Sequence, residues 1–144
     1  MKKIALITNF NIADKVNAAI LVVQKLREYG CDVITPAYNK EKIARHRFAR
    51  GRLELTYVSQ DTMYSEAELL IILGGDGTIL EASRRAAMRK IPILGINLGR
   101  VGYMAELELN ELDLIDNYFS GNYTTEERMM LDVSVLDKSD RIIY

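Results

Sequence analysis

The residues with the clearest chemical potential form the sequence Gly74-Gly75-Asp76-Gly77-Thr78, which directly follows the apolar run 69–73. Glycines let backbone amides approach an oxyanion closely and permit positive φ angles, so this loop is typical of a phosphate site. A helix predicted after the loop directs the positive end of its dipole at the same point. Because a carboxylate repels phosphate unless it binds a bridging cation or accepts a proton from a hydroxyl group, we interpret Asp76 as a participant in chemistry.

The glycine loop differs from two common nucleotide motifs. No Gly-Lys-Ser/Thr sequence follows it at the P-loop spacing, and Leu80 stands where a dinucleotide fingerprint has its third glycine. Two roles remain open for Asp76: a ligand of Mg²⁺ between phosphate oxygens, or the base that takes a proton from an attacking hydroxyl. Phosphoryl transfer accommodates both roles.

A second cluster covers residues 95–103, again after an apolar run, and has the sequence Gly-Ile-Asn-Leu-Gly-Arg-Val-Gly-Tyr. The amide of Asn97 can bond a ribose hydroxyl or a base edge, and the guanidinium of Arg100 can bind phosphate. Tyr103 is a further candidate contact, although the residues themselves favour a core position for Tyr103 and Met104 over a ligand contact. Both glycine-rich clusters should face one crevice.

The apolar pattern predicts the elements that position these clusters. Runs typical of buried strands occur at four places: residues 4–7, 31–34, 69–73 and 92–96. Helical periodicity separates them, most clearly at 12–26 and from 78 to about 89. Since such runs alternate with helices, we expect an α/β fold with a doubly wound, mostly parallel sheet. Ligands of these sheets bind beyond the carboxyl ends of the strands, where both clusters fall.

The segment from residue 39 to 68 has the least regular pattern. Its first half is basic and contains Lys40, Lys42, Arg45, Arg47, Arg50 and Arg52. We interpret this half as a solvated helix face that precedes a short strand near residues 53–57, with a mobile basic flap over phosphates as the alternative.

The pattern changes again near residue 122. A short helix is predicted at 110–119, whereas residues 131–136 alternate like a strand, 138–140 suggest a turn, and 141–144 begin a returning strand. We therefore expect an α/β domain over residues 1–122 and the start of a truncated, β-rich C-terminal domain over residues 123–144.

Composition narrows the classes of function. The chain has 144 residues, 49% of them apolar, and a formal net charge of -1, which favours a small-molecule partner over nucleic acid. No apolar run approaches the ~20 residues of a membrane span, and we expect a cytoplasmic protein. The single Cys31 is interpreted as a buried apolar residue. The chain has a single histidine, His46, which excludes a multi-histidine zinc site.

The two glycine-rich clusters, together with Glu127-Arg128-Met129-Met130-Leu131, resemble the NAD kinase family over nearly the whole chain. The resemblance implies transfer of a phosphoryl group from ATP, or from polyphosphate, to the adenosine-ribose 2′-hydroxyl of NAD, assisted by Mg²⁺ or another divalent cation. It makes Asp76 the catalytic proton acceptor and a possible metal ligand. It also implies nucleotide contacts by the residues of both clusters: Gly74, Gly75, Asp76, Gly77, Thr78, Asn97, Arg100 and Tyr103.

Two alternatives to an NAD kinase remain. The Gly-Gly-Asp-Gly-Thr element occurs also in diacylglycerol and sphingosine kinases, so a lipid kinase of the same superfamily is one alternative. A non-catalytic nucleotide-binding module is the other. The resemblance further implies a homo-oligomer, a dimer or tetramer. From the charge and the short apolar runs we expect no nucleic-acid or membrane partner.

Overall fold

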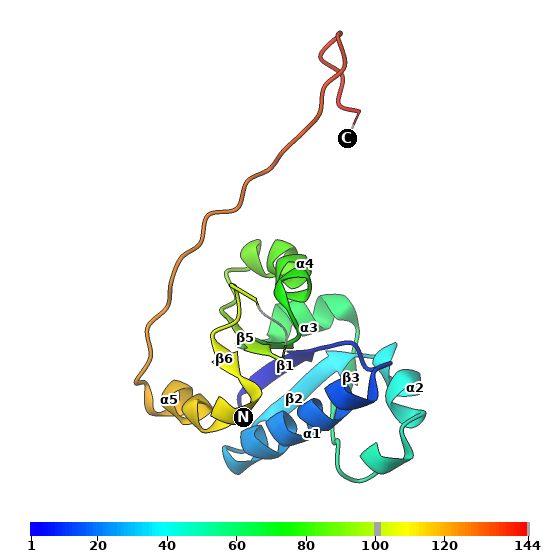
Figure 1. The fold of residues 1–144 in the computed structure, drawn as a ribbon, viewed down its shortest axis with the longest axis vertical. Coiled ribbons are helices and arrows are strands. Elements are labelled where there is room, and N and C mark those ends of the chain that lie inside the picture. The colour runs from blue at the N-terminus through cyan, green and yellow to red at the C-terminus, as the bar shows by residue number, and fades with distance from the viewer. Residues whose placement is uncertain (100–101, 144) are drawn as a thin grey trace.

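Six parallel strands form the central sheet, in the order β3-β2-β1-β4-β5-β6 (Figure 1). The computed structural model describes residues 1–99 and 102–143. The strands are β1 (Lys3–Ile7), β2 (Asp32–Pro36), β3 (Thr56–Val58), β4 (Leu69–Leu73), β5 (Ile93–Asn97) and β6 (Leu107–Glu108). The parallel pairing confirms the α/β fold expected from the sequence.

Helices cover both faces of the sheet, as the strand order requires. They are α1 (Ala13–Glu28), α2 (Asn39–Ala44), α3 (Gln60–Glu66), α4 (Asp76–Ala87) and α5 (Ile115–Ser120), with 3₁₀ helices η1 (Arg47–Ala49) and η2 (Leu109–Leu114). The chain moves toward one edge through β1, β2 and β3, and toward the other edge through β4 and β5. Right-handed crossovers in opposite directions place α1 and α4 on opposite faces.

The strand residues alternate between two apolar clusters, one for each face. In β4, Leu69, Ile71 and Leu73 belong to the cluster beneath α1, whereas Leu70 and Ile72 belong to the cluster beneath α3 and α4. All five side chains are buried. Each contributes about 1.5–3 kcal/mol relative to an exposed position, which explains why this run forms a central strand.

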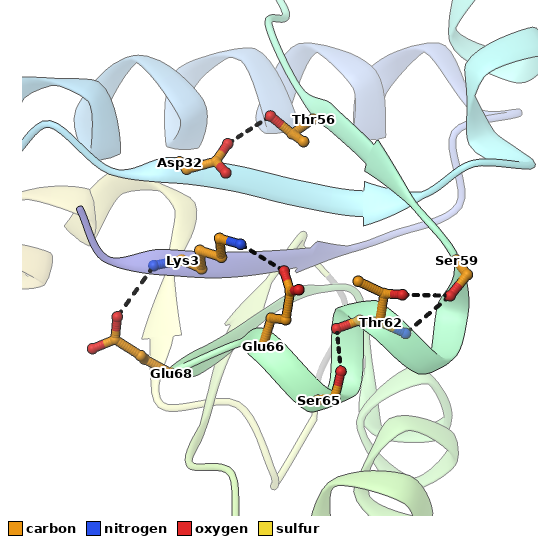
Figure 2. Close-up of polar contacts among 8 residues, drawn as sticks. All are labelled: Lys3, Asp32, Thr56, Ser59, Thr62, Ser65, Glu66 and Glu68. Carbon is orange, nitrogen blue, oxygen red and sulfur yellow. Dashed lines mark hydrogen bonds and ion pairs between the residues drawn. The ribbon is translucent and has the colours of Figure 1, made fainter.

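Polar contacts help to fix the positions of α3 and of the edge strand β3 (Figure 2). The Lys3 ammonium lies 2.6 Å from the Glu66 carboxylate at the end of α3. Thr56 Oγ1 donates to Asp32 Oδ1 at 2.6 Å, joining β3 to β2. Ser59 caps α3, because its hydroxyl accepts a hydrogen bond from the Thr62 N–H at 3.0 Å. These contacts hold α3 and the edge strand in register.

Helix α5 packs against the end of α1. Lys25 Nζ lies 2.7 Å from Asp116 Oδ1, and the Tyr29 hydroxyl donates to the same oxygen at 2.6 Å. The rings of Tyr29 and Phe119 stack with centroids 3.9 Å apart. The predicted helix at 110–119 is thus found as η2 followed by α5.

Residues 122–143 extend away from the sheet, as Figure 1 shows. The predicted turn is present, since Leu136 and Ile142 form an antiparallel bridge and the Asp137 N–H donates to the Arg141 carbonyl at 2.9 Å. The strand expected at 131–136 forms no ladder beyond this bridge in the described residues. Many apolar side chains of this segment are exposed, among them Met129, Leu131, Val133 and Ile142.

Candidate functional site

The turn from β4 into α4 carries the Gly-Gly-Asp-Gly-Thr sequence. Helix α4 begins at Asp76, with Gly75 as its N-cap residue, and no side chain caps this end. The helix therefore starts two residues before Thr78, where the sequence predicted it. The first N–H groups of a helix lack intrahelical partners, so this end is suited to bind an anion.

Asp76 is held by the loop that follows β5. Its Oδ1 atom accepts hydrogen bonds from the N–H groups of Tyr103 and Met104, both at 3.1 Å, and its Oδ2 atom lies 3.2 Å from the Tyr103 nitrogen. The side chain is half-buried. These contacts join the two glycine-rich clusters, which the sequence placed at the same crevice.

The glycines of the first cluster serve different purposes. None of Gly74, Gly75 and Gly77 has a positive φ angle, so the turn does not use the left-handed backbone that glycine permits. A Cβ atom on Gly74 would lie 2.8 Å from Thr78 Oγ1, which explains this glycine by close packing. A Cβ atom on Gly75 or Gly77 would meet nothing within 4 Å. Open space next to these two residues leaves room for a ligand.

Asn97 is the last residue of β5 and is buried. Its Nδ2 group donates to Glu108 Oε1 at 2.9 Å, across the β5–β6 pair. This contact fixes the orientation of the side-chain amide at the carboxyl edge of the sheet. The amide thus lies at the end of β5 and already has one protein partner.

The middle of β5 is packed closely against the β5–β6 connection. The Gly95 N–H donates to Glu106 Oε2 at 2.7 Å, and the Glu106 N–H donates back to the Gly95 carbonyl at 3.0 Å. Arg128 lies 3.7 Å from the other Glu106 oxygen and donates to the Met104 carbonyl at 3.5 Å. The loop that holds Asp76 is therefore itself anchored at two points.

The second cluster contains two further candidate ligand contacts, Tyr103 and Arg100. The Tyr103 side chain is 89% exposed, so the core position considered for it is wrong, and the residue contacts Asp76 through its backbone. Met104 is half-buried against the cluster beneath α3 and α4. Arg100 lies outside the described residues.

A cavity of about 450 Å³ lies on the other side of the start of α4. Its walls come from the carboxyl ends of β1 and β2 and from four helices, and they include Thr8, Asn9, Lys15, Tyr38, Asn39, Lys42, Tyr64, Thr78, Glu81 and Arg85. Of these residues, the sequence singled out Thr78 alone as a ligand contact. The basic stretch within residues 39–52 was a signal for Lys42, which is the one of its lysines and arginines that lines the cavity.

Burial disfavours the charged form of two side chains, Tyr64 at the cavity and Cys31 at the amino end of β2. Burial raises the pKa of the Tyr64 hydroxyl, and the neighbouring Arg85 guanidinium opposes this shift. Burial also raises the pKa of the Cys31 thiol, which is consistent with its expected role as a buried apolar residue. Within the described residues, no three or more His, Cys, Asp or Glu side chains form a metal cluster.

The geometry defines a class of protein. A doubly wound parallel sheet with a glycine-rich helix start, and with an aspartate at the carboxyl edge of its strands, is the architecture of a nucleotide-binding α/β domain. The helices of the described part of the chain include none long and apolar enough to cross a membrane.

The sequence matches the family described as ATP-NAD kinase N-terminal domain over residues 4–123, and the chain belongs to this family. An NAD kinase of Natranaerobius thermophilus is 58% identical over 80 residues, which cover 55% of this chain and 28% of the relative. An NAD kinase of Azoarcus sp. is 32% identical over 98% of this chain and 46% of the relative. One from Caldanaerobacter subterraneus subsp. tengcongensis is 34% identical over 99% of this chain and 48% of the relative.

The chain spans about half the length, or less, of the curated relatives it matches. Among solved structures, yeast NADH kinase complexed with NADH matches with a TM-score of 0.67 at 20% identity, over 85% of this chain and 39% of that one. This likeness supports the fold. The relatives are named NAD kinases, so the lipid-kinase alternative is not favoured.

Proposed function

We propose that this chain is the N-terminal, nucleotide-binding part of an NAD kinase, which transfers the terminal phosphoryl group of ATP or polyphosphate to the 2′-hydroxyl of the adenosine ribose of NAD. The observation that carries the proposal is the position of Asp76. Its carboxylate lies at the helix start, beside open backbone at Gly75 and Gly77, and is oriented by two N–H groups from the next loop. A phosphate and a ribose hydroxyl can meet at such a point.

In the proposed reaction, Asp76 accepts the proton of the 2′-hydroxyl as the ribose oxygen attacks the phosphorus atom. The bond from phosphorus to the bridging oxygen of the donor breaks, and that oxygen leaves with the shortened donor. The amides at the start of α4 stabilise the charge of the transferred group. Asn97 and Tyr103 are proposed to contact NAD, and the same role is proposed for Arg100.

A divalent cation fits this arrangement only if substrate phosphates supply most of its ligands. Mg²⁺ in proteins is often bound by one or two carboxylates together with substrate phosphates, rather than by a cage of protein ligands. Asp76 offers one carboxylate, and its Oδ2 atom has the lighter hydrogen-bond load of the two oxygens. When bound, the cation would neutralise phosphate charge.

The domain boundary, the location, the partners and the oligomeric state are also proposed. We place the boundary of the α/β domain at residue 122 and propose that residues 123–144 begin a β-rich domain, in keeping with the single bridge at Leu136 and Ile142. A cytoplasmic location, small-molecule nucleotide partners and a homo-oligomeric full-length protein are likewise predictions that follow from the family.

Product analysis by mass spectrometry tests the reaction. The protein expressed from its complete gene and residues 1–144 alone are each incubated with ATP, Mg²⁺ and one of NAD, diacylglycerol or fructose 6-phosphate. NADP formed by the complete protein supports the proposal, and its formation or absence with residues 1–144 shows whether further chain is needed. A phosphorylated lipid or sugar without NADP contradicts it, and nucleotide binding without any product favours a binding module.

A further inference from the structure

Arg128 reaches back from the segment after α5 to the loop that holds Asp76. It lies in the stretch 127–131, to which the proposed reaction gives no role. Its Nη1 atom donates to the Met104 carbonyl at 3.5 Å, and its Nη2 atom lies 3.7 Å from Glu106 Oε1. One guanidinium group thus contacts two residues of the same loop.

Met104 is bound through both of its backbone groups. Its N–H donates to Asp76 Oδ1 at 3.1 Å, and its carbonyl accepts a hydrogen bond from Arg128. The two groups flank one Cα atom, and peptide units are planar, so only the φ and ψ angles of Met104 separate the two contacts. A shift of the guanidinium therefore displaces the N–H groups that orient the carboxylate.

Glu106 connects the same guanidinium to the central sheet. Its Oε2 atom accepts the Gly95 N–H at 2.7 Å, while its Oε1 atom faces Arg128. A charge-assisted hydrogen bond of this kind gives the carboxylate a fixed orientation against the middle of β5. Because β5 pairs with β4, Arg128 is tied to the strand that leads into the turn of Asp76.

A local ion pair is the simpler explanation of Arg128. Its Nη2 atom also donates to Glu126 Oε2 at 3.3 Å, two positions earlier in the chain, and the Glu126 side chain is 76% exposed. Such a pair has little effect on stability and does not need the loop. It does not explain why the other terminal nitrogen of the guanidinium contacts the Met104 carbonyl. The two explanations differ in which partner of Arg128 matters.

The contacts of Arg128 with the loop bear on geometry more than on stability. The Arg128 side chain is 46% exposed and that of Glu106 is 40% exposed, so their ion pair stabilises the fold only slightly. A general base must lie within hydrogen-bond reach of the proton that it accepts, and an error of about 1 Å can lower a rate by ~10²-fold. A residue that fixes the loop can thus alter the rate without altering the melting temperature.

We infer that Arg128 is a positioning residue for Asp76. By binding the Met104 carbonyl and Glu106 together, it holds the loop after β5 in the path that presents the Tyr103 and Met104 N–H groups to the carboxylate. The inference rests on the proposed function and deepens it, because it makes the orientation of the proton acceptor depend on the segment that follows α5. A change in that segment alters turnover from outside the crevice.

Two measurements on the complete protein test the inference: steady-state kinetics of NADP formation, and hydrogen exchange of peptides that span residues 102–107, followed by mass spectrometry. The variants are Arg128→Gln, Arg128→Lys and Glu106→Gln. Glu126→Gln is the matched control for the local ion pair. Arg141→Gln is the control for removing an arginine from the same segment, because the ion pair of Arg141 is local. Thermal melts establish that every variant is folded.

We expect Arg128→Gln to lower kcat by roughly tenfold, in keeping with the loss of a charge-assisted hydrogen bond. The KM values for NAD and ATP should stay within about twofold, since the residue acts on the proton acceptor and not on substrate binding. Exchange in residues 102–107 should become about threefold faster or more, because the loop opens more often.

The other variants should follow the contacts that they keep. Arg128→Lys retains the charge and a donor but loses the planar fork, so it should recover part of the rate. Glu106→Gln retains an acceptor oxygen but loses the charge, so it should lose less of the rate than Arg128→Gln. Glu126→Gln and Arg141→Gln should match the original protein in both measurements.

Four results would overturn the inference. They are an unchanged kcat in Arg128→Gln, an equal loss of kcat in either control, a raised KM for NAD or ATP with kcat unchanged, and a lower kcat without faster exchange in residues 102–107. The third result would make Arg128 a substrate contact. If Arg128→Gln does not fold, Arg128→Lys and Glu106→Gln decide the question by the same criteria.

Hydrogen exchange keeps this test separate from the proposed function, because it needs no substrate. A complete protein that forms no NADP contradicts the kinase reaction, and the exchange rates then decide the inference alone. Faster exchange of residues 102–107 in Arg128→Gln but not in Glu126→Gln would show that the guanidinium holds the loop. Equal exchange rates in these two variants would overturn the inference.

Discussion

The carboxylate of Asp76 joins two loops that are 27 residues apart in sequence, because its Oδ1 atom accepts hydrogen bonds from the backbone N–H groups of Tyr103 and Met104. Both donors are backbone groups, so the contact depends on the path of the loop and not on the side chains it carries. Oδ2 has only the 3.2 Å contact with the Tyr103 N–H. Oδ2 is therefore the oxygen better placed to accept a proton from a substrate.

The substitution Asp76→Asn tests this role. The asparagine Oδ1 atom can still accept hydrogen bonds from the loop, so we expect the fold to be kept. An amide cannot take up the proton, so NADP formation by the complete protein should fall by at least ~10²-fold. Initial rates of NADP production, measured together with a thermal melt, give both quantities.

Asp61→Asn is the matched control for Asp76→Asn, because Asp61 is an exposed carboxylate of α3 that lies outside the crevice. We expect it to leave the rate within about twofold of the original, as is usual for exposed charges. Full activity in Asp76→Asn would exclude the carboxylate as the proton acceptor. A melt that falls with the rate would indicate that the contact with the loop is what matters.

Gly77→Ala separates a structural glycine from one that makes room for a ligand. Gly77 lies in the first turn of α4, and a Cβ atom there would meet nothing within 4 Å. Alanine should therefore raise the free energy of unfolding by roughly 0.5–1 kcal/mol. If phosphate approaches this backbone, the methyl group should weaken ATP binding at the same time. Urea denaturation and calorimetry measure the two effects.

Ala87→Gly is the reverse change at the other end of the same helix, and it serves as the control. It should lower the free energy of unfolding by a similar amount without changing ATP affinity. A more stable Gly77→Ala protein with unchanged ATP affinity would mean that the open space at this residue is not used by the donor.

Gly95→Ala is expected to destabilise the protein through overpacking. A Cβ atom at this position would lie 2.7 Å from Ile79 Cδ1 and 3.0 Å from Ala105 Cα, and the second contact is with backbone that cannot rotate away. We expect a loss of about 1–3 kcal/mol in the free energy of unfolding, measured by urea denaturation. Gly75→Ala, which meets nothing within 4 Å, is the control. Equal stability of the two variants would contradict this account of the packing.

The central strands could be predicted from the sequence because burial on both faces leaves a direct signal. Residues 4–7 and 69–73 are continuous apolar runs, and they are β1 and β4. The helix ends were less predictable. Thr78 with Glu81 fits a capping box, yet α4 begins at Asp76, since Gly75 can take the N-cap position without a side chain. At the start of η2, by contrast, the Glu108 N–H donates to Glu111 Oε2 at 2.8 Å, as in a capping box.

Only the parts of the candidate site that lie in one continuous stretch of sequence could be predicted. The sequence indicated Asp76 and its phosphate-type loop, but not that the Tyr103 backbone holds the carboxylate, because that contact depends on the strand order. The cavity residues Lys15 and Arg85 were missed for the same reason. Each is an ordinary basic residue on a helix, and only the sheet topology brings them together with Lys42.

The docking of α5 on α1 should depend on pH through Asp116. Hydrogen bonds from Lys25 and from the Tyr29 hydroxyl lower the pKa of this carboxyl group below its usual value. A carboxyl group whose pKa is lowered by folding stabilises the folded state at any pH above its pKa in the unfolded chain, about 3.9. This stabilisation is lost as the pH falls through the lower pKa of the folded state. The melting temperature should therefore fall more steeply below about pH 4 in the original chain than in Asp116→Asn.

Thermal melts of the two proteins from pH 7 to pH 3 measure this difference. At pH 7 Asp116→Asn should melt at the lower temperature, and the gap should narrow as the pH falls, because protonation removes the same charge from the original chain. Asp113→Asn is the control, since Asp113 lies 3.5 Å from the same Lys25 ammonium but its side chain is 98% exposed. An exposed ion pair of this kind contributes little to stability. The melting temperature of Asp113→Asn should therefore vary with pH as that of the original chain does. A constant gap between Asp116→Asn and the original chain at every pH would show that the packing of α5 does not depend on this charge.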